Sequence, residues 1–206
     1  MIPFLRLTLL ATRYNFIIID ICSTALSQKG KVNLEKIFAF IDSQNLNLGV
    51  KNDIVDLKTR EQIYTGWRLS FPKLYRYLVD KYKVTKAYIF IGKVEGNEGL
   101  YSSLADAGYE LIFKPTLEIT YPEGGTTRKG NVDAELVLQT MIELENFDKA
   151  IIIAGDGDYY CLIKHLISIG KLSKILIPNR YRFSRLLNEF RDYFEYVSDL
   201  EAKLKK

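Results

Sequence analysis

Four aspartates lie where the chain leaves an apolar run or begins a helical stretch, and together they could bind a divalent metal ion. Asp42 ends the run Phe-Ala-Phe-Ile-Asp, and Asp156 and Asp158 follow Ile-Ile-Ile-Ala in a Gly-Asp-Gly-Asp turn. Asp133 begins a stretch of helical spacing after Lys-Gly-Asn-Val. Carboxylates crowded within about 4 Å repel by roughly 1 to 4 kcal/mol per pair near a protein surface, so a fold tolerates such a cluster mainly where a cation neutralises it.

The ligand type indicates the metal. An oxygen-only set without histidine favours Mg²⁺ or Mn²⁺ over zinc. Such an ion can orient a water molecule, lower its pKa and stabilise the oxyanion that leaves during phosphodiester cleavage. Taken alone, each aspartate is better explained as a turn residue or a helix cap, so the metal hypothesis requires that all four converge. Gly155 and Gly157 flank Asp156, and we expect them to permit the tight turn that aims Asp156 and Asp158 at one point.

Polar and basic side chains near these aspartates are candidates for substrate contacts. Asn45 follows Asp42 by three residues and could hold a metal-bound water or a substrate oxygen, although a polar residue at a helix start explains it equally well. Arg128 and Lys129 precede Asp133 and could contact a phosphate backbone, with solvated surface charges as the alternative.

The elements that must position these residues follow the pattern of a parallel α/β fold. Short apolar runs rich in Ile, Val and Phe alternate with stretches of helical period, which is typical of βαβ units. The runs are apolar on both faces, so we expect helices on both faces of the sheet. In open α/β sheets, ligands bind at the carboxyl ends of the strands, where Asp42 and Asp156 stand. The strands are predicted at residues 37–42, 86–93, 110–116, 150–154 and 174–178.

Helices are predicted between these strands. Ser70 can cap one that carries Pro72 in its first turn, and a helix over residues 97–107 stops at Gly108. Another begins near Asp133, a fourth covers residues 159–169 and ends at Gly170, and a short one spans residues 184–190. Residues 47–66 and 121–130 fit no element, and we predict a mobile, basic-ended loop for the second segment.

Composition bounds the class of protein. The 206 residues fit one domain with or without an appendage, and the 48% of hydrophobic residues excludes a disordered or fibrous chain. A formal charge of +4 permits a phosphate-rich partner without demanding one. Cys22 and Cys161 form no zinc or disulfide pattern, which favours a reducing compartment, and we interpret Cys161 as a packing residue. The single histidine, His165, has no second histidine with which to form a ligand pair, so we interpret it as structural.

The first thirty residues are apolar after a basic start, as in a secretory signal. Arg13 and Asp20 interrupt the apolar run, and each costs roughly 2.5 to 3.5 kcal/mol at the middle of a membrane helix. We therefore expect a cytoplasmic protein without a membrane partner, and a signal or anchor stays open as the alternative. Residues 1–33 are predicted to be an N-terminal extension of uncertain role, and residues 34–206 the functional domain.

Three motifs resemble the NYN family of PIN-like nuclease domains. They are Phe-Ile-Asp-Ser-Gln-Asn at 40–45, Lys-Gly-Asn-Val-Asp at 129–133 and Ala-Gly-Asp-Gly-Asp-Tyr at 154–159, and the resemblance spans roughly residues 37–197. It implies a Rossmann-like PIN fold and a metal-dependent endoribonuclease, with RNA, expected to be single-stranded, as substrate. It also implies that the acidic residues of the motifs are catalytic and bind Mg²⁺ or Mn²⁺, with Asn45 in support; these are Asp42, Asp133, Asp156 and Asp158. Ser43 and Gln44 stand where the family often has glycine after the first aspartate, which could alter access to the site.

The same residues allow other functional hypotheses. Hydrolases of the haloacid dehalogenase type need Asp-x-Asp after the first strand, where this chain has Asp-Ser-Gln. A Toprim domain needs a glutamate on the earlier strand, where this chain has Asp42. The alternative that the sequence leaves open is a catalytically silent PIN-like module that binds RNA or a protein. Whether the chain forms a homodimer also stays open.

Overall fold

The computed structural model describes the backbone of residues 35–115, 117–120, 126–129 and 132–206, and the side chains of residues 35–114 and 132–206. The predictions for residues 1–33 lie outside these ranges, so the domain division near residue 34 stays a prediction. Within the described part of the chain, no helix is both long and apolar enough to cross a membrane.

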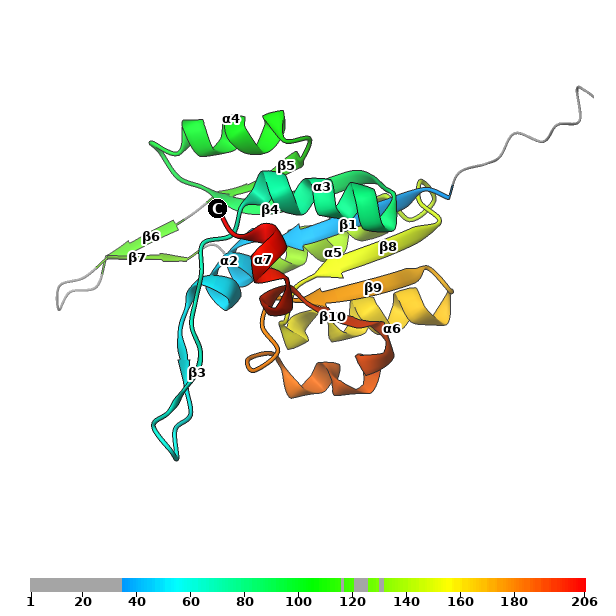
Figure 1. The fold of residues 1–206 in the computed structure, drawn as a ribbon. Helices are drawn as coiled ribbons and strands as arrows, with labels where there is room; N and C mark the ends of the chain where they lie inside the picture. The colour runs from blue at the N-terminus through cyan, green and yellow to red at the C-terminus, as the bar shows by residue number, and fades with distance from the viewer. Residues whose placement is uncertain (1–34, 116, 121–125, 130–131) are drawn as a thin grey trace, which may run out of the picture. The chain divides into compact units, whose positions relative to one another are not determined.

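The centre of the fold is a six-stranded sheet in the order β10-β9-β8-β1-β4-β5, in which every pairing is parallel (Figure 1). All six residues of β1 are buried, since the strand has neighbours on both sides and helices on both faces. This confirms the predicted α/β fold, and it adds the edge strand β10, which is too short for periodicity to reveal. The strands are β1 (Ile37–Asp42), β4 (Val84–Lys93), β5 (Glu110–Pro115), β8 (Lys149–Ile153), β9 (Leu172–Ile177) and β10 (Phe194–Tyr196).

The predicted helices are present, except that the last one, predicted over 184–190, forms as a 3₁₀ segment over Arg185–Tyr193 without a side-chain cap from Ser184. Ser70 accepts a hydrogen bond from the backbone N–H of Lys73 at the start of α3, and Gly108 and Gly170 adopt positive φ where α4 and α6 end. The α-helices are α2 (Ser43–Lys51), α3 (Phe71–Tyr82), α4 (Glu98–Asp106), α5 (Asp133–Ile142), α6 (Tyr160–Ser168) and α7 (Glu201–Leu204), and the 3₁₀ segments are η1 (Gly157–Tyr159), η2 (Arg185–Tyr193) and η3 (Val197–Leu200).

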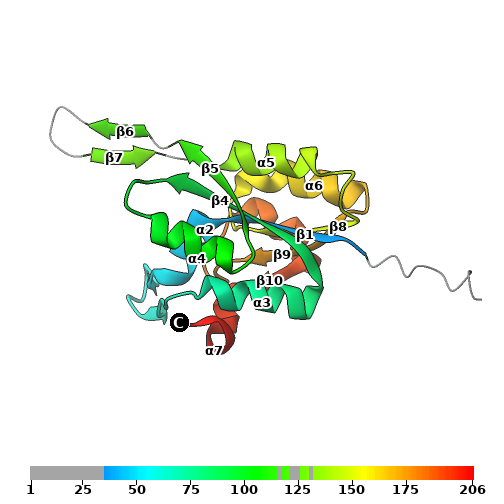
Figure 2. The ribbon, with the colours of Figure 1, turned by 90° about the horizontal axis from the view of Figure 1, so that it is seen from above.

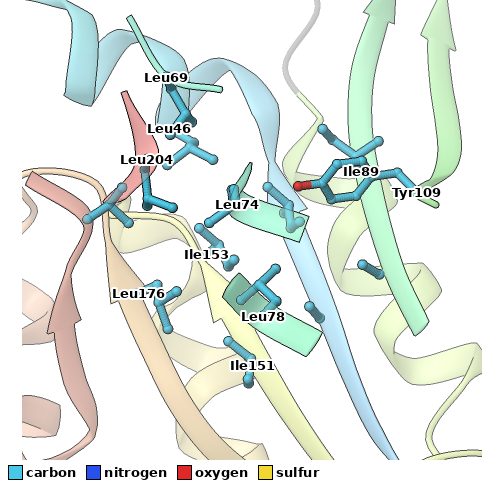
Figure 3. Close-up of a cluster of buried hydrophobic side chains, with 14 of the residues drawn as sticks. Leu46, Leu69, Leu74, Leu78, Ile89, Tyr109, Ile151, Ile153, Leu176 and Leu204 are labelled. Carbon is cyan, nitrogen blue, oxygen red and sulfur yellow. The ribbon is translucent and has the colours of Figure 1, made fainter. Parts of the chain in front are cut away.

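Two hydrophobic cores lie on the two faces of the sheet. Helices α3 and α7 lie on one side of the strands, and α5 and α6 lie on the other (Figure 2). Figure 3 shows the first core, in which Leu74 and Leu78 of α3 meet Ile151 and Ile153 of β8. Trp67 belongs to the same core and is only 3% exposed. The second core includes Phe40, Tyr88, Phe147, Leu136, Leu162 and Leu166.

Each of the two segments without a predicted element contributes to a two-stranded antiparallel sheet. Strands β2 (Ile54–Val55) and β3 (Gln62–Tyr64) pair within residues 47–66, after α2 has extended to Lys51. Strand β7 (Thr126–Lys129) pairs with β6 (Leu117–Thr120), so the predicted loop over 121–130 is wrong for residues 126–129. The β-branched residues Ile119, Thr120, Thr126 and Thr127 favour the extended conformation, a local signal that the Pro-Glu-Gly-Gly sequence between the two pairs obscures.

One side chain on α6 lies where the sequence interpretation did not put it. Cys161 is exposed, which contradicts its interpretation as a packing residue, and His165 is exposed as well. The buried face of α6 is instead formed by Leu162, Ile163 and Leu166. The helical spacing of apolar residues predicted α6 itself. Which face of α6 packs against the sheet depends on the tertiary structure.

Candidate active site

The predicted aspartates lie at the point where the strand order of the sheet reverses. From β1 the chain proceeds to β4 and β5 on one side, and it later returns to β8, β9 and β10 on the other. The connections therefore diverge between β1 and β8, which leaves a crevice at the carboxyl ends of these two strands. Asp42 is the last residue of β1, and Asp156 follows β8 by three residues.

Tyr159 joins Asp42 to Asp133 by hydrogen bonds. Its hydroxyl lies 2.9 Å from Asp42 Oδ2 and 2.6 Å from Asp133 Oδ1, and its side chain is fully buried. A phenol has one proton to donate, so it cannot donate to both carboxylates at once. Burial first, and then the charge of Asp133, raise the pKa of Asp42 in spite of the hydrogen bonds that Asp42 accepts from Asn45 N–H and Tyr159. Burial and the neighbouring carboxylate therefore outweigh the hydrogen bonds that Asp42 accepts.

Asp156 and Asp158 extend this acidic group. Asp156 caps η1, and its Oδ1 accepts a hydrogen bond of 3.3 Å from the backbone N–H of Asp158. The pKa of the exposed Asp158 is raised by the charge of Asp156 first and then by a hydrogen bond with Asp133 and the charge of Asp133. Asp133, on the first turn of α5, thus interacts with both Asp158 and Tyr159.

Asn45 ties the two walls of the crevice together. Its Oδ1 accepts a hydrogen bond of 2.8 Å from the backbone N–H of Gly155, and its own N–H is capped by Asp42 Oδ1 at 2.9 Å. The side chain therefore fixes the end of β8 against the start of α2. Its Nδ2 forms no hydrogen bond with the described residues and remains available as a donor at the surface of the cleft.

The two glycines around Asp156 serve packing rather than turn geometry. Neither Gly155 nor Gly157 has positive φ. The turn around Asp156 therefore does not require the backbone conformations that only glycine adopts easily, contrary to the expectation from the sequence. A Cβ on Gly157 would lie 2.5 Å from Ser184 Oγ, and one on Gly155 would lie 3.2 Å from the Cβ of Phe183. The glycines allow residues 183–184 to approach the acidic turn closely.

A cleft of about 590 Å³ opens over this edge of the sheet. It is large enough for a ligand of nucleotide size. One wall carries the acidic residues and α2, and the other is formed by the segment that follows β9. The lining includes Asp42, Asn45, Asp133, Asp156, Arg182 and Ser184.

The donor set of the site suits a hard divalent cation. Its side chains offer carboxylate oxygens without histidine or thiolate. Burial and the charge of Asp133 raise the pKa of Asp42, and the charge of Asp156 raises that of Asp158. In the side-chain arrangement described for residues 35–114 and 132–206, no three acidic, histidine or cysteine residues surround one ion position. Tyr159 instead takes up one oxygen each of Asp42 and Asp133.

Sequence reasoning missed two residues of the site. Tyr159 stands inside the third motif, but nothing in the sequence shows that its hydroxyl turns back toward Asp42 and Asp133. Arg182 follows the end of β9, and the strand-end rule that identified Asp42 would have marked it if applied to this strand too. The side chains of the predicted phosphate contacts, residues 128 and 129, lie outside the described residues, while the backbone of both belongs to β7.

Comparisons with known proteins agree with this architecture. The family model of the NYN domain matches residues 36–198. NYN domains are in general nucleases of PIN-like fold, and they typically use divalent metals. A search of curated proteins finds no match.

Two solved structures are similar to the chain. One is a protein of unknown function from Vibrio parahaemolyticus, with a TM-score of 0.62 and 19% identity over 85% of this chain and 99% of that protein. The other is a ribokinase from E. coli, with a TM-score of 0.34 and 14% identity over 78% of this chain and 58% of that one. The first likeness extends to the fold alone.

Proposed function

The chain belongs to the NYN family, as its three motifs predicted, and on that premise we propose that it is a metal-dependent endoribonuclease that cleaves single-stranded RNA. The family suggests interaction with nucleic acid, and the acidic group at the strand-order reversal offers the chemistry. Four aspartates would hold Mg²⁺ or Mn²⁺; they are Asp42, Asp133, Asp156 and Asp158. This requires their side chains to turn toward one ion position, which no three of them surround in the arrangement described for residues 35–114 and 132–206.

One observation supports this proposal most directly. Asp42 and Asp133 come from elements about ninety residues apart in the chain, yet both contact the same buried hydroxyl of Tyr159 at the ligand-binding edge of the sheet. Asp42 is only 5% exposed, and burial, together with the charge of Asp133, raises its pKa. A buried, uncompensated carboxylate is costly unless a ligand supplies positive charge.

The residues of the chain would have distinct roles. Tyr159 holds Asp42 and Asp133 side by side, and Asn45 keeps the end of β8 against α2, so the acidic groups are positioned before substrate arrives. The Asn45 amide can donate to a substrate oxygen. When bound, a divalent ion lowers the pKa of a coordinated water and stabilises the oxyanion that leaves the phosphodiester.

An RNA cleavage assay tests this proposal. End-labelled single-stranded RNAs of several sequences are incubated with the purified chain and either Mg²⁺ or Mn²⁺, with and without chelator. We expect internal cleavage that chelator abolishes and that Asp156→Asn reduces to background. Asp80→Asn is the matched control, because Asp80 is exposed near the end of α3, which leads into the opposite edge of the sheet at the start of β4.

Two results would overturn the proposal. One is the absence of cleavage across all RNAs by folded protein, which would favour the silent RNA- or protein-binding module. The other is cleavage that Asp156→Asn leaves unchanged, which would assign the activity to a contaminant or to a different site.

A further inference from the structure

Arg182 places an unpaired positive charge on the wall of the acidic cleft. It belongs to the segment of residues 178–184 between β9 and η2, and it lines the cleft together with Asp42 and Asp156. None of the described residues forms a hydrogen bond or an ion pair with its guanidinium group. An exposed arginine that lines the same cleft as two carboxylates, without pairing with them, is available to contact an anion there.

The backbone that carries Arg182 is fixed to both walls of the crevice. Asn179 is fully buried, and its Nδ2 donates a hydrogen bond of 3.0 Å to the carbonyl of Gly49 in α2. Its Oδ1 accepts from Tyr181 N–H at 2.9 Å, and its carbonyl accepts from Arg182 N–H at 3.3 Å. Ser184 N–H donates to the carbonyl of Gly155 at 2.8 Å. The position of Arg182 is therefore set by α2 on one side and by the end of β8 on the other.

A second arginine of the same segment has a different environment. Arg180 forms an ion pair of 2.9 Å with Asp199, and its guanidinium lies over the ring of Tyr196 at 5.1 Å. These contacts hold Arg180 against β10 and η3. Two arginines that are two residues apart thus have separate roles, one structural and one directed at the cleft.

We propose that Arg182 binds a backbone phosphate of single-stranded RNA opposite the acidic edge, an inference that rests on the proposed function and names a binding residue for it. Guanidinium groups match phosphate oxygens in charge and in geometry. Asp42 is recessed, since it is only 5% exposed, so a strand must bend into the cleft to reach it. An unpaired strand can do so, and its free base edges can meet the amides of Gln44 and Asn52 on the α2 side of the cleft.

Equilibrium binding tests the role of Arg182 separately from catalysis. A fluorescently labelled single-stranded RNA of mixed sequence is titrated in chelator, and its anisotropy is followed at several salt concentrations. Arg182→Gln should weaken binding about tenfold, the low end for hydrogen bonds to a charged group. It should also make the slope of log K against log salt shallower by about 0.7, the value for one single-strand phosphate contact. Arg180→Gln is the matched control and should leave both affinity and slope unchanged.

The outcomes separate this inference from the proposed function. RNA binding that depends on Arg182, in a protein that never cleaves RNA, would support the phosphate contact and refute the nuclease. The wild type could cleave RNA while the Arg182→Gln variant binds RNA with wild-type affinity and salt slope. That result would refute the phosphate contact of Arg182 and leave the proposed nuclease activity standing. Equal losses in Arg180→Gln and Arg182→Gln would show a general effect of charge or folding, and undetectable binding by the wild type would also overturn the inference.

Discussion

Replacing Asp42 with asparagine should stabilise the metal-free protein at neutral pH. The asparagine keeps an oxygen that accepts from Asn45 N–H, as Asp42 Oδ1 does at 2.9 Å. Its amide nitrogen takes the place of the oxygen that lies 2.9 Å from the Tyr159 hydroxyl, so it can donate to that hydroxyl. The Tyr159 proton then goes to Asp133 alone, and every polar group has a partner.

The size of this gain follows from the charge that is removed. One carboxylate oxygen of Asp42 and one of Asp133 contact the same Tyr159 hydroxyl, so the two charges lie about 5 Å apart. Two unit charges at this distance repel by roughly 1 to 3 kcal/mol at an effective dielectric constant between 80 and 20. Because Asp133 is half-exposed, solvent screening favours the lower end, and we expect the free energy of unfolding to rise by about 1 kcal/mol.

The gain should depend on pH in a defined direction. Burial and Asp133 raise the pKa of Asp42 above its ordinary value of 3.8, so the folded protein binds the proton more tightly than the unfolded chain. The wild type therefore loses stability as the pH rises from about 3.8 through the raised pKa of Asp42. The asparagine variant does not titrate at this position, so its advantage should be largest at neutral pH and should vanish on acidification.

Denaturant unfolding measures this difference. The single tryptophan, Trp67, is buried in the core, so its fluorescence reports the loss of tertiary structure. The curves are recorded in chelator at neutral pH and near pH 4, and again with excess Mn²⁺. Mn²⁺ should stabilise the wild type, and the Asp80→Asn control with it, whereas the Asp42→Asn variant should respond much less. A variant less stable than the wild type in chelator at neutral pH, or an advantage that persists at low pH, would refute the argument from charge.

Two further changes test the packing around the site. Tyr159→Phe should lower the free energy of unfolding by about 1 to 3 kcal/mol in the same fluorescence assay, because the buried Asp42 loses a donor; unchanged stability would show that the hydroxyl contributes nothing. Gly66→Ala should lower the unfolding midpoint markedly, since its Cβ would lie 1.9 Å from the carbonyl oxygen of Lys51. Gly99→Ala is the control in open space within α4, and an equal effect of the two substitutions would contradict the clash.

The sequence identified the aspartates because each stands at a boundary of local structure. Asp42 ends and Asp156 follows a short apolar run whose length and β-branched or aromatic content favour a buried strand, and Asp133 begins a stretch of helical spacing. Such boundaries depend on neighbours in the chain, so they can be predicted without knowledge of distant contacts. The parallel sheet follows in the same way, since strands that are apolar on both faces need helices on both sides.

The tertiary structure alone decided how these residues meet. The strand order places β8 beside β1, and no local pattern specifies that neighbour because pairing depends on the whole chain. The hydroxyl of Tyr159, the tie between Asn45 and Gly155, and the position of Arg182 all join residues that are distant in sequence. The spacing of hydrophobic residues indicates which residues are buried. The direction of a polar side chain, in contrast, depends on the hydrogen-bond partner that lies near it in the folded protein. The sequence therefore determined the fold class and the candidate ligands, and the packing of α2, α5 and the segment after β9 decided the geometry of the site.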